Sequence, residues 1–496
     1  MTLRRAAPFL ALTALAGCTV GPNFERPQAS VSGGYADPGR APRKAPVVTP
    51  GEGPQFGWWT AFGSPELDRL VNQAMANNQS LAASNATLAK ARARIDAVAG
   101  KRLPQVDGNA RIEHEQVNLQ AFGFDPAAFG QPGAGNPVFN LYTVGGGVSY
   151  DLDVFGANRR AVEQSVAQAE AQQHQTEAAH LTIAGRVVSQ VLTIAAIRER
   201  IATSQQIIAE GQRNVRLTDA RCKAGAGTLV EVLSAQGQLA NDQADLPQLD
   251  QQLVEARAML ATLIGLSPAE LGATDFDFTS FTLPSDIPVT MPSLLVRKRP
   301  DILQAEADLH AATAAIGIAT ARLYPDITLG ATLSGAASTP GDIFGSNFRG
   351  FDIFAGLSAP IFHGGTLKAN KRGAEADAQA RVATYKETVL EAFAQVSNLL
   401  AALNNDTRSV ATQQQAADIA SRSLRLSRRS FQVGNSGILT VLDSSRIYQR
   451  SRLSLVEARA RQFLNVSRLY VATAGGWTGQ EMQAAATDPA TGTQQP

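Results

Sequence analysis

The stretch that decides the fold is residues 327–334, Ile-Thr-Leu-Gly-Ala-Thr-Leu-Ser, in which apolar and polar residues alternate without a break. Such a period of two predicts a β-strand with one apolar and one polar face. Residues 351–358 repeat the pattern after a loop, and residues 106–117 and 138–150 repeat it less cleanly earlier in the chain. The sequence therefore predicts two β-hairpins, each made of two strands.

The predicted strands have the length and pattern of membrane β-barrel strands, which need about 9–11 residues. Four strands cannot close a barrel, because the smallest barrels have about eight. An open sheet in lipid would leave edge N–H and C=O groups unpaired, at several kcal/mol each. We therefore expect copies of the chain to share one barrel. Three copies give about twelve strands and an aqueous lumen, and two give about eight and a plugged interior. Alternation alone also allows soluble hairpins packed on helices.

Two long segments without proline, residues 157–221 and 367–432, each predict a near-continuous helix of about 65 residues and about 100 Å. A first apolar stripe repeats in the second segment with steps of three and four, and a second stripe lies beside it. Two stripes let a helix contact neighbours on both sides, as in the wall of a cylinder. A solvent-exposed coiled-coil spacer without a lumen is the alternative. The first stripe is Val382, Tyr385, Val389, Ala392, Val396, Leu399 and Leu403, and the second is Leu390, Phe393 and Leu400.

The N-terminus predicts export and acylation. Arg4 and Arg5 precede an apolar run too short to span a membrane but right for a secretory signal. The run ends in Leu-Ala-Gly-Cys at residues 15–18, which resembles a bacterial lipobox, so we expect a lipid (palmitate) on Cys18. An ordinary cleaved signal with a chance cysteine is the alternative. Thr19 is compatible with sorting to the outer membrane, and acyl chains anchor a protein without spanning the bilayer.

The C-terminal half of the chain repeats the N-terminal half. Residues 223–234 align with 432–443 at an offset of 209, and residues 81–106 align with 302–327 at an offset of 221. Each half reads helix, strand, loop, strand, long helix, glycine turn, helix, which indicates duplication.

The expected organisation places two repeats between terminal segments. The chain begins with a signal peptide at 1–17 and an acylated extended segment at 18–60, and it ends with a mobile tail at 476–496. The first repeat, at 61–265, has a hairpin at about 104–150 and a helical tip at 223–228. An equatorial connector at 266–292 leads to the second repeat at 293–475, with a hairpin at about 326–360 and a tip at 433–437.

Composition excludes several classes of function. Forty-four basic and 43 acidic residues leave a formal net charge of +1, so no basic field exists to hold nucleic acid. The five histidines share no metal-ligand spacing with cysteine or acidic residues, and no nucleophile, base and orienting group can be assembled. We expect no enzyme, no metal and no cofactor beyond the covalent lipid on Cys18. Cys222 is expected to be a free thiol or a packed apolar group.

Several short motifs, spread over nearly the whole mature chain, resemble the TolC/OprM-like outer-membrane factors of tripartite RND-type efflux systems, in their acylated branch. His363 stands where that family usually has Asp, in a turn. The motifs are GPNFERP at 21–27, Trp58-Trp59 with Phe62, YDLDVFG at 150–156, RPDI at 299–302, PIFHGG at 360–365, VLD at 441–443 and GGW at 475–477.

The resemblance implies a mixed α and β membrane protein that forms a homotrimer. A 12-stranded β-barrel in the outer membrane would continue into a 12-helix α-barrel through the periplasm. The function implied is a passive exit duct for drugs or other small molecules, without catalysis. It implies as partners a periplasmic adaptor (membrane fusion) protein and an inner-membrane RND-type pump. A type I protein secretion channel and a non-pore coiled-coil structural lipoprotein remain alternatives.

The candidate adaptor-contacting tips lie where the long helices stop. Gly225 and Gly434 are predicted to adopt the left-handed turn that joins each long helix to the returning one. By resemblance, these turns, with Thr228 and Gly437, are what adaptor hairpins contact.

The candidate periplasmic gate follows directly after the tips. Leu439 and Asp443 are four residues apart and should share one helix face. By resemblance, Leu439 would narrow the pore, and Asp443, which matches the constriction acid of the family, would form a negative ring. Arg446 is spaced to pair with Asp443 and hold a closed state. Glu231 is the corresponding acid of the first repeat. Thr440 stands where some relatives have a second acid.

Overall fold

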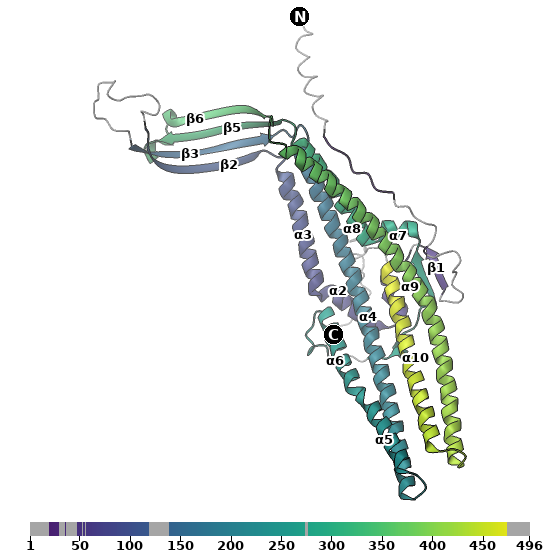
Figure 1. The fold of residues 1–496 in the computed structure, drawn as a ribbon. Coiled ribbons are helices and arrows are strands. Elements are labelled where there is room, and N and C mark those ends of the chain that lie inside the picture. Colours follow the sequence, from purple (N-terminus) through teal and green to yellow (C-terminus); the bar gives the residue numbers. More distant parts are fainter. Residues whose placement is uncertain are drawn as a thin grey trace, which may run out of the picture. The chain divides into compact units, whose positions relative to one another are not determined.

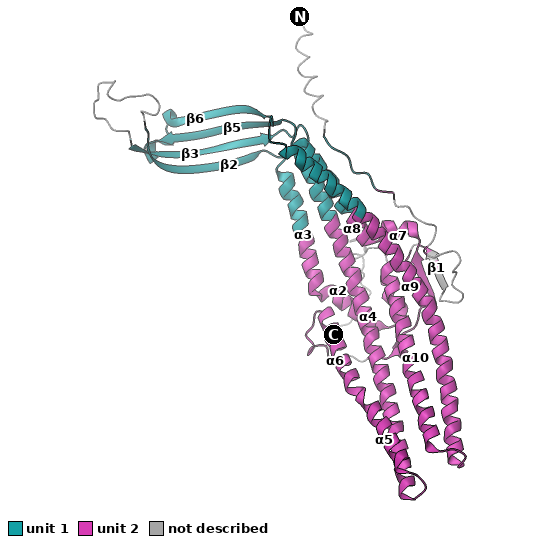
Figure 2. Ribbon diagram, in the orientation of Figure 1, with its two compact units in different colours: residues 1–26, 89–170, 307–383 teal, residues 27–88, 171–306, 384–496 magenta. Residues whose placement is uncertain are grey.

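The computed structural model of the protein describes residues 19–28, 35, 47–51, 53–54, 56–118, 138–272 and 276–473. The predicted signal peptide, Cys18 and the predicted tail at 476–496 lie outside the described residues. Two compact units are built from alternating parts of the chain (Figure 2). Unit 1 consists of residues 1–26, 89–170 and 307–383, and unit 2 of residues 27–88, 171–306 and 384–496.

Unit 1 contains one antiparallel four-stranded sheet in the order β2-β3-β5-β6 (Figure 1). The strands confirm both predicted hairpins. The central pairing joins the two halves of the chain, with Val148 opposite Ala331. Within the described residues, the outer edges of β2 and β6 have no ladder partner. The strands are β2 (Gln105–Gln116), β3 (Val138–Asp151), β5 (Asp326–Ala337) and β6 (Arg349–Ser358).

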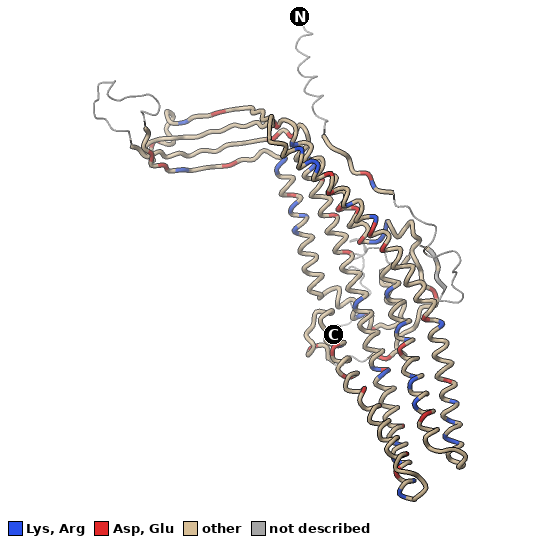
Figure 3. Tube along the Cα trace, in the orientation of Figure 1, with Lys and Arg blue, Asp and Glu red and all other residues tan. Residues whose placement is uncertain are grey.

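The register of the sheet gathers its apolar side chains on one face. Phe351, Ile353 and Leu357 lie opposite Leu333, Ala331 and Ile327, and this row continues across β3 into β2. Phe351 and Ile353 are each 78% exposed. Charged residues of the strands are few (Figure 3), and all but Arg349, at the start of β6, lie on the other face. The sheet therefore has one face suited to an apolar solvent and one suited to water.

The helices confirm the predicted rods. The longest are α4 (Ala157–Lys223) and α9 (Thr366–Gln432), each of 67 residues. The return helix of the first half differs from the expectation of one helix. It breaks at Asp245 into two, because Pro247 cannot continue the hydrogen-bond ladder. The other helices are α2 (Pro65–Asn77), α3 (Gln79–Gly100), α5 (Leu229–Ala244), α6 (Leu246–Leu263), α7 (Pro292–Lys298), α8 (Pro300–Ala321) and α10 (Ile438–Thr473), with short turns η2 (Trp58–Phe62), η5 (Phe278–Ser280), η6 (Pro340–Asp342) and η7 (Ser346–Phe348).

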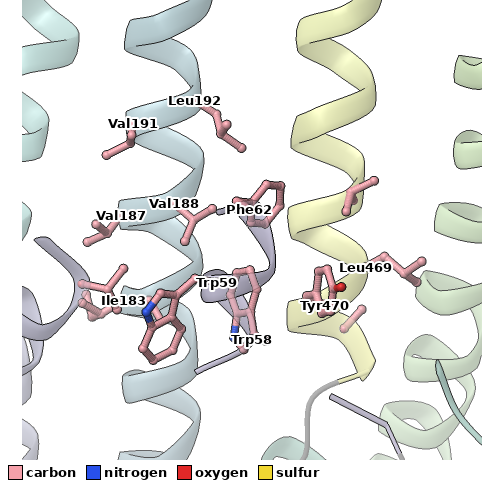
Figure 4. Close-up of a cluster of buried hydrophobic side chains, with 14 of the residues drawn as sticks. Trp58, Trp59, Phe62, Ile183, Val187, Val188, Val191, Leu192, Leu469 and Tyr470 are labelled. Atoms are coloured by element: carbon pink, nitrogen blue, oxygen red, sulfur yellow. The ribbon is translucent and has the colours of Figure 1, made fainter. Parts of the chain in front are cut away.

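The core of unit 2 forms where η2 packs against α4 and α10 (Figure 4). Trp58 stacks on Tyr470 with ring centroids 5.3 Å apart, and the indole of Trp59 donates to Asp68 Oδ1 at 2.7 Å. Val187 and Val191 of α4 are fully buried in the same cluster. Among the described helices, α4 alone holds a window apolar and long enough to cross a membrane, and 72% of that window is buried in the structure. The apolar residues of α4 are therefore explained by packing in the core of unit 2.

The predicted stripes of α9 fall into two groups. Tyr385, Val389, Ala392, Val396 and Leu403 of the first stripe are buried in the unit 2 core, whereas Val382 and Leu399 are half-buried. Phe393 and Leu400 of the second stripe are also half-buried against that core, and Leu390 is 68% exposed.

A second sheet was missed by the sequence prediction. β1 (Val47–Gly51) lies in the segment expected to be merely extended, and it pairs in parallel with β4 (Asp286–Thr290) of the connector. Thr290 is buried, and its hydroxyl donates to the Thr473 carbonyl at 2.6 Å. Both strands have five residues and contain a proline, which argues against a strand in sequence reasoning.

The duplication is visible in one pair of matched contacts. Asn78 Nδ2 donates to the Leu263 carbonyl at 2.8 Å, and Arg299 Nη1 donates to the Ala472 carbonyl at 3.1 Å. Residues 78 and 299 correspond at the offset of 221, and residues 263 and 472 at the offset of 209. In the first half, the residue before α3 is thus bonded to the last turn of α6, and in the second half the residue before α8 is bonded to the last turn of α10.

Candidate functional site

The two helical tips have the same backbone geometry. Gly225 and Gly434 are both left-handed, with φ of 70° and 80°, as the sequence predicts. In each tip the glycine N–H donates to the carbonyl three residues earlier, at 3.0 and 3.1 Å. The next N–H donates to the carbonyl five residues earlier, at 2.9 Å in both. This pattern ends a helix by satisfying its last carbonyls, and it requires a residue without a Cβ penalty at the left-handed position.

The helices that follow the two tips begin differently. Thr228 caps α5 in a capping box: its hydroxyl accepts from Glu231 N at 3.3 Å, and its N–H donates to Glu231 Oε2 at 3.0 Å. Gly437, the matching residue of the second repeat, lies directly before α10, and its carbonyl accepts from Thr440 N at 3.3 Å. The Glu231 carboxylate is therefore engaged locally, which by itself accounts for an acid at this position.

The other candidate gate residues lie on one side of α10. Leu439 is 50% exposed, and Asp443 and Arg446 are exposed, whereas Ile438 and Val441 are buried against α9. Arg446 Nη2 donates to Asp443 Oδ1 at 2.6 Å, which is the pairing expected from their spacing. The three candidate side chains thus face away from the hairpin that carries them.

Three side-chain contacts connect the two helical hairpins near their tips. Arg428 Nη2 donates to Glu210 Oε2 at 3.2 Å, and the Arg221 guanidinium lies 4.7 Å from the centre of the Phe431 ring. Arg452 also donates to the side chain of Gln206, at 2.7 Å. Sequence reasoning missed these contacts because the partners are more than 200 residues apart in the chain.

A carboxylate of α5 lies in an unfavourable position beside α4. Burial raises the pKa of Asp242 above its ordinary value, and a hydrogen bond from Gln238 to Oδ1 at 2.8 Å opposes this shift. Asp242 Oδ2 has no hydrogen-bond partner among the described residues. A buried carboxylate with one free oxygen costs stability when it is ionised.

The segment after the predicted acylation site is fixed to unit 1. Arg159 donates to the Thr19 hydroxyl at 2.9 Å, and Val20 N donates to the Phe155 carbonyl at 3.2 Å. Arg160 donates to Asn23 Oδ1 at 2.8 Å and pairs with Glu163 at 2.6 Å. These contacts hold the N-terminal segment beside the turn that follows strand β3.

No group of three or more His, Cys, Asp or Glu residues that could hold a metal is present in the part of the chain that the structure describes. Cys222 is a half-exposed free thiol at the end of α4. The functional surfaces of the described chain are thus a sheet with one apolar face, and two helical tips joined by polar contacts.

A four-stranded sheet with one exposed apolar face, in a chain that also has two long helical hairpins, is typical of one class of protein, the membrane-channel subunit. Residues 70–266 and 291–475 match the family model described as "Outer membrane efflux protein". The chain belongs to the outer membrane efflux protein family.

Two curated relatives and one solved structure illustrate the similarity. The pyoverdine export outer membrane protein OpmQ of Pseudomonas aeruginosa is 31% identical over 420 residues, which cover 85% of this chain and 87% of OpmQ. The probable outer membrane lipoprotein SilC of Salmonella typhimurium is 25% identical over 467 residues, covering 93% of this chain and 96% of SilC. The solved structure of the outer-membrane channel OprN superposes with a TM-score of 0.82 and 28% identity, covering 93% of this chain and 100% of OprN.

These similarities establish the place and the kind of activity of the protein. It is an efflux channel of the outer membrane that extends into the periplasm, as the sequence motifs imply. Its family consists of channels and not of enzymes.

Proposed function

We propose that three copies of the chain form one continuous duct, with a 12-stranded β-barrel in the outer membrane and a wall of twelve helices below it. The observation that carries this proposal is the sheet of unit 1, which has four strands, two open edges and one exposed apolar face. In lipid, the unpaired edge groups would cost several kcal/mol each unless strands of other copies satisfy them. Three copies supply twelve strands, an even number with room for an aqueous lumen.

The lipid anchor belongs to the same proposal. We infer that the signal peptide is removed and that Cys18 is acylated. The contacts of Thr19 and Val20 with unit 1 support this inference, because they hold the chain next to residue 18 beside the end of β3. An acyl chain there would enter the same membrane surface as the strands, and would add to the anchoring without forming any part of the pore.

The tips of the helical hairpins are proposed as the gate and as the contact for an adaptor. Leu439 and Asp443 would form rings that narrow the pore in a threefold assembly, with Arg446 held on Asp443 in the closed state. Glu231 would contribute through its place at the start of α5. The tips at Gly225, Thr228, Gly434 and Gly437 would contact a periplasmic adaptor protein.

The channel is proposed to work passively, with transport driven by an inner-membrane pump of the RND type. The cargo class that the relatives favour is small molecules, since the similar protein OpmQ is named for pyoverdine export. No residue of the described chain is required to react with the cargo.

The test is to image the purified, full-length protein in lipid nanodiscs and to record its conductance in planar bilayers. We expect threefold particles with a closed barrel wall, and single-channel currents. Monomeric particles, or trimers whose sheets do not join, would overturn the shared barrel. Neutralising Asp443 as Asp443→Asn should raise the resting conductance, and an unchanged conductance would remove this residue from the gate.

A further inference from the structure

A basic groove runs along unit 2 between helices α4, α6 and α10. Two adjoining hollows, of about 420 and about 360 Å³, share Arg468 and together form it. Arg186 lines the first hollow, and Arg200 and Arg461 line the second. We call this feature the arginine groove. Its floor and sides also carry neutral polar groups from α4, including Ser189.

The arginine groove lies on the face of α4 opposite to the core. At about 100° per residue, the mean direction of the groove residues Arg186 and Ser189 lies about 180° from the mean direction of the core residues Val187, Val188 and Val191. In Figure 4, Val188 points toward Phe62 of η2, whereas Val187 and Val191 project from the other side of α4, and all three belong to the core of unit 2. The groove is therefore on the side of the helical layer that η2 does not cover.

The charge in the groove is unbalanced. Four arginines line the two hollows, and Glu457 is the single carboxylate in the lining, although Arg461 also approaches Asp406 outside the lining at 4.0 Å. Arg200 pairs with Glu457 at 3.7 Å, yet its Nε atom is buried without a hydrogen-bond partner. Arg468 donates to Asn465 at 3.3 Å, which leaves its positive charge without a carboxylate. The groove thus concentrates positive charge in a chain whose net charge is only +1.

Arg186 is the most available of these cations. It is exposed and makes no hydrogen bond or ion pair with any residue that the structure describes. Most of the neighbouring residues of α4 are buried, whereas Arg186 is exposed, so packing between helices does not require an arginine at this position. A guanidinium presents several donors in a flat fork that fits a carboxylate, and it retains its charge at any ordinary pH.

The arginine groove should face the inside of the duct. This step rests on the proposed trimer: a lumen must stay open, so the additional layer of η2 and α2 has to lie outside the helical wall. The opposite face, with the groove, then lines the path of the cargo. Threefold symmetry would repeat the groove three times around this path and focus the field on a passing anion.

We propose that the arginine groove binds the carboxylate groups of anionic cargo as it passes through the duct. Arg186 and Arg468 supply the free charge, and Arg200 and Arg461 extend the site along α4 and α10. A groove of this kind favours organic acids over neutral or cationic molecules of similar size. Because Arg186, Arg461 and Arg468 are exposed, bound cargo would stay partly hydrated and could be released.

The test is a calorimetric titration of citrate into the purified full-length trimer at an ionic strength of about 10 mM, where screening is weak. We expect saturable binding that weakens as salt is raised to about 150 mM. The double variant Arg186→Gln, Arg468→Gln should weaken citrate binding about tenfold or more, since it removes two charge-assisted contacts. Arg186→Lys should keep part of the affinity, because it preserves the charge and loses the fork.

The matched control is Arg459→Gln, an exposed arginine of α10 that donates to Gln414 and does not line either hollow. Its citrate affinity should stay within about twofold of that of the parent protein, because a distant surface charge is screened. The proposal is overturned if the parent protein does not bind citrate, or if the double variant binds it as tightly as the parent. A groove covered by a second copy of the chain would give the first of these results.

The two proposals fail in different ways. Parent trimers that conduct no ions in bilayers would refute the duct, whatever citrate does. Parent trimers that conduct but do not bind citrate would refute the arginine groove and leave the duct intact. If the double variant does not assemble, Arg186→Lys and the salt dependence of citrate binding by the parent protein still decide the question.

Discussion

In the proposed duct, the contact between Arg428 and Glu210 should oppose the separation of the two helical hairpins, and so oppose opening. Arg428 lies on α9 and Glu210 on α4, so their hydrogen bond connects the two helical hairpins. The side chain of Arg428 is 40% exposed and that of Glu210 is 20% exposed. Replacing Arg428 by alanine removes this contact and leaves the mostly buried Glu210 carboxylate without its cation.

The size of the effect follows from that partial burial. Exposed ion pairs contribute about 0.2–1 kcal/mol, and hydrogen bonds to charged groups about 1.5–3 kcal/mol, so we take about 1 kcal/mol for each chain. If the three hairpins of a trimer move together, the loss is about 3 kcal/mol, which favours the open state about 100-fold. If each hairpin moves alone, the factor is about fivefold for each chain.

The assay is the open probability of single Arg428→Ala channels in planar bilayers at fixed salt. Arg425→Ala is the matched control, because Arg425 donates to Ser421 on its own helix and does not reach the other hairpin. We expect a marked increase for Arg428→Ala and little change for the control. Equal open probabilities for both variants and the parent protein would refute the idea that this contact opposes opening.

Three further predictions concern stability and insertion. Thr228→Ala removes the capping box of α5 and should cost about 1 kcal/mol, seen as faster cleavage at the first tip in limited proteolysis, while trimer assembly is retained. Asp242→Asn should raise the melting temperature at pH 7, with a gain that shrinks toward pH 4. The reason is that the pKa of Asp242 is higher in the folded protein than in the unfolded chain, so the folded protein is most stable when the pH is below the unfolded pKa and the carboxyl is protonated. This stability is lost as the pH rises through the folded pKa, where the buried carboxylate ionises. A gain in melting temperature that does not depend on pH would contradict this explanation. Ile353→Arg should prevent membrane insertion, because an arginine on the lipid face costs about 2–4 kcal/mol at the middle of the bilayer, whereas Asp352→Arg on the other face should insert normally. The measurement is the amount of heat-resistant trimer on a gel, which should be lost for Ile353→Arg and retained for Asp352→Arg.

Most of the fold follows from local patterns that are visible along the chain. Alternation in residues 327–334 and absence of proline in residues 157–221 define strands and rods directly, because the periods of 2 and 3.6 are properties of the backbone. The tips were equally predictable, since a left-handed turn after a long helix selects glycine at positions such as 225 and 434.

The remaining features depend on contacts between distant residues. The pairing of β1 with β4 joins two short, proline-containing strands about 240 residues apart, and neither has a pattern of its own. The arginine groove brings Arg186 and Arg468 together from helices separated by most of the chain. For Glu231 the sequence prediction noted an acid after a tip and overlooked that Thr228 and Glu231 have the spacing of a capping box, which the structure shows to be formed.

The matched contacts of Asn78 and Arg299 carry a consequence for the ancestry of the assembly. If three copies of the present chain form the proposed duct, a half-length ancestor with one such junction would have needed six identical subunits to form the same wall. Fusion then freed the two junctions to drift apart, one keeping an amide and the other a guanidinium that also holds Asp301. In the proposed trimer, junctions held by an amide and junctions held by a guanidinium would therefore alternate around the helical wall.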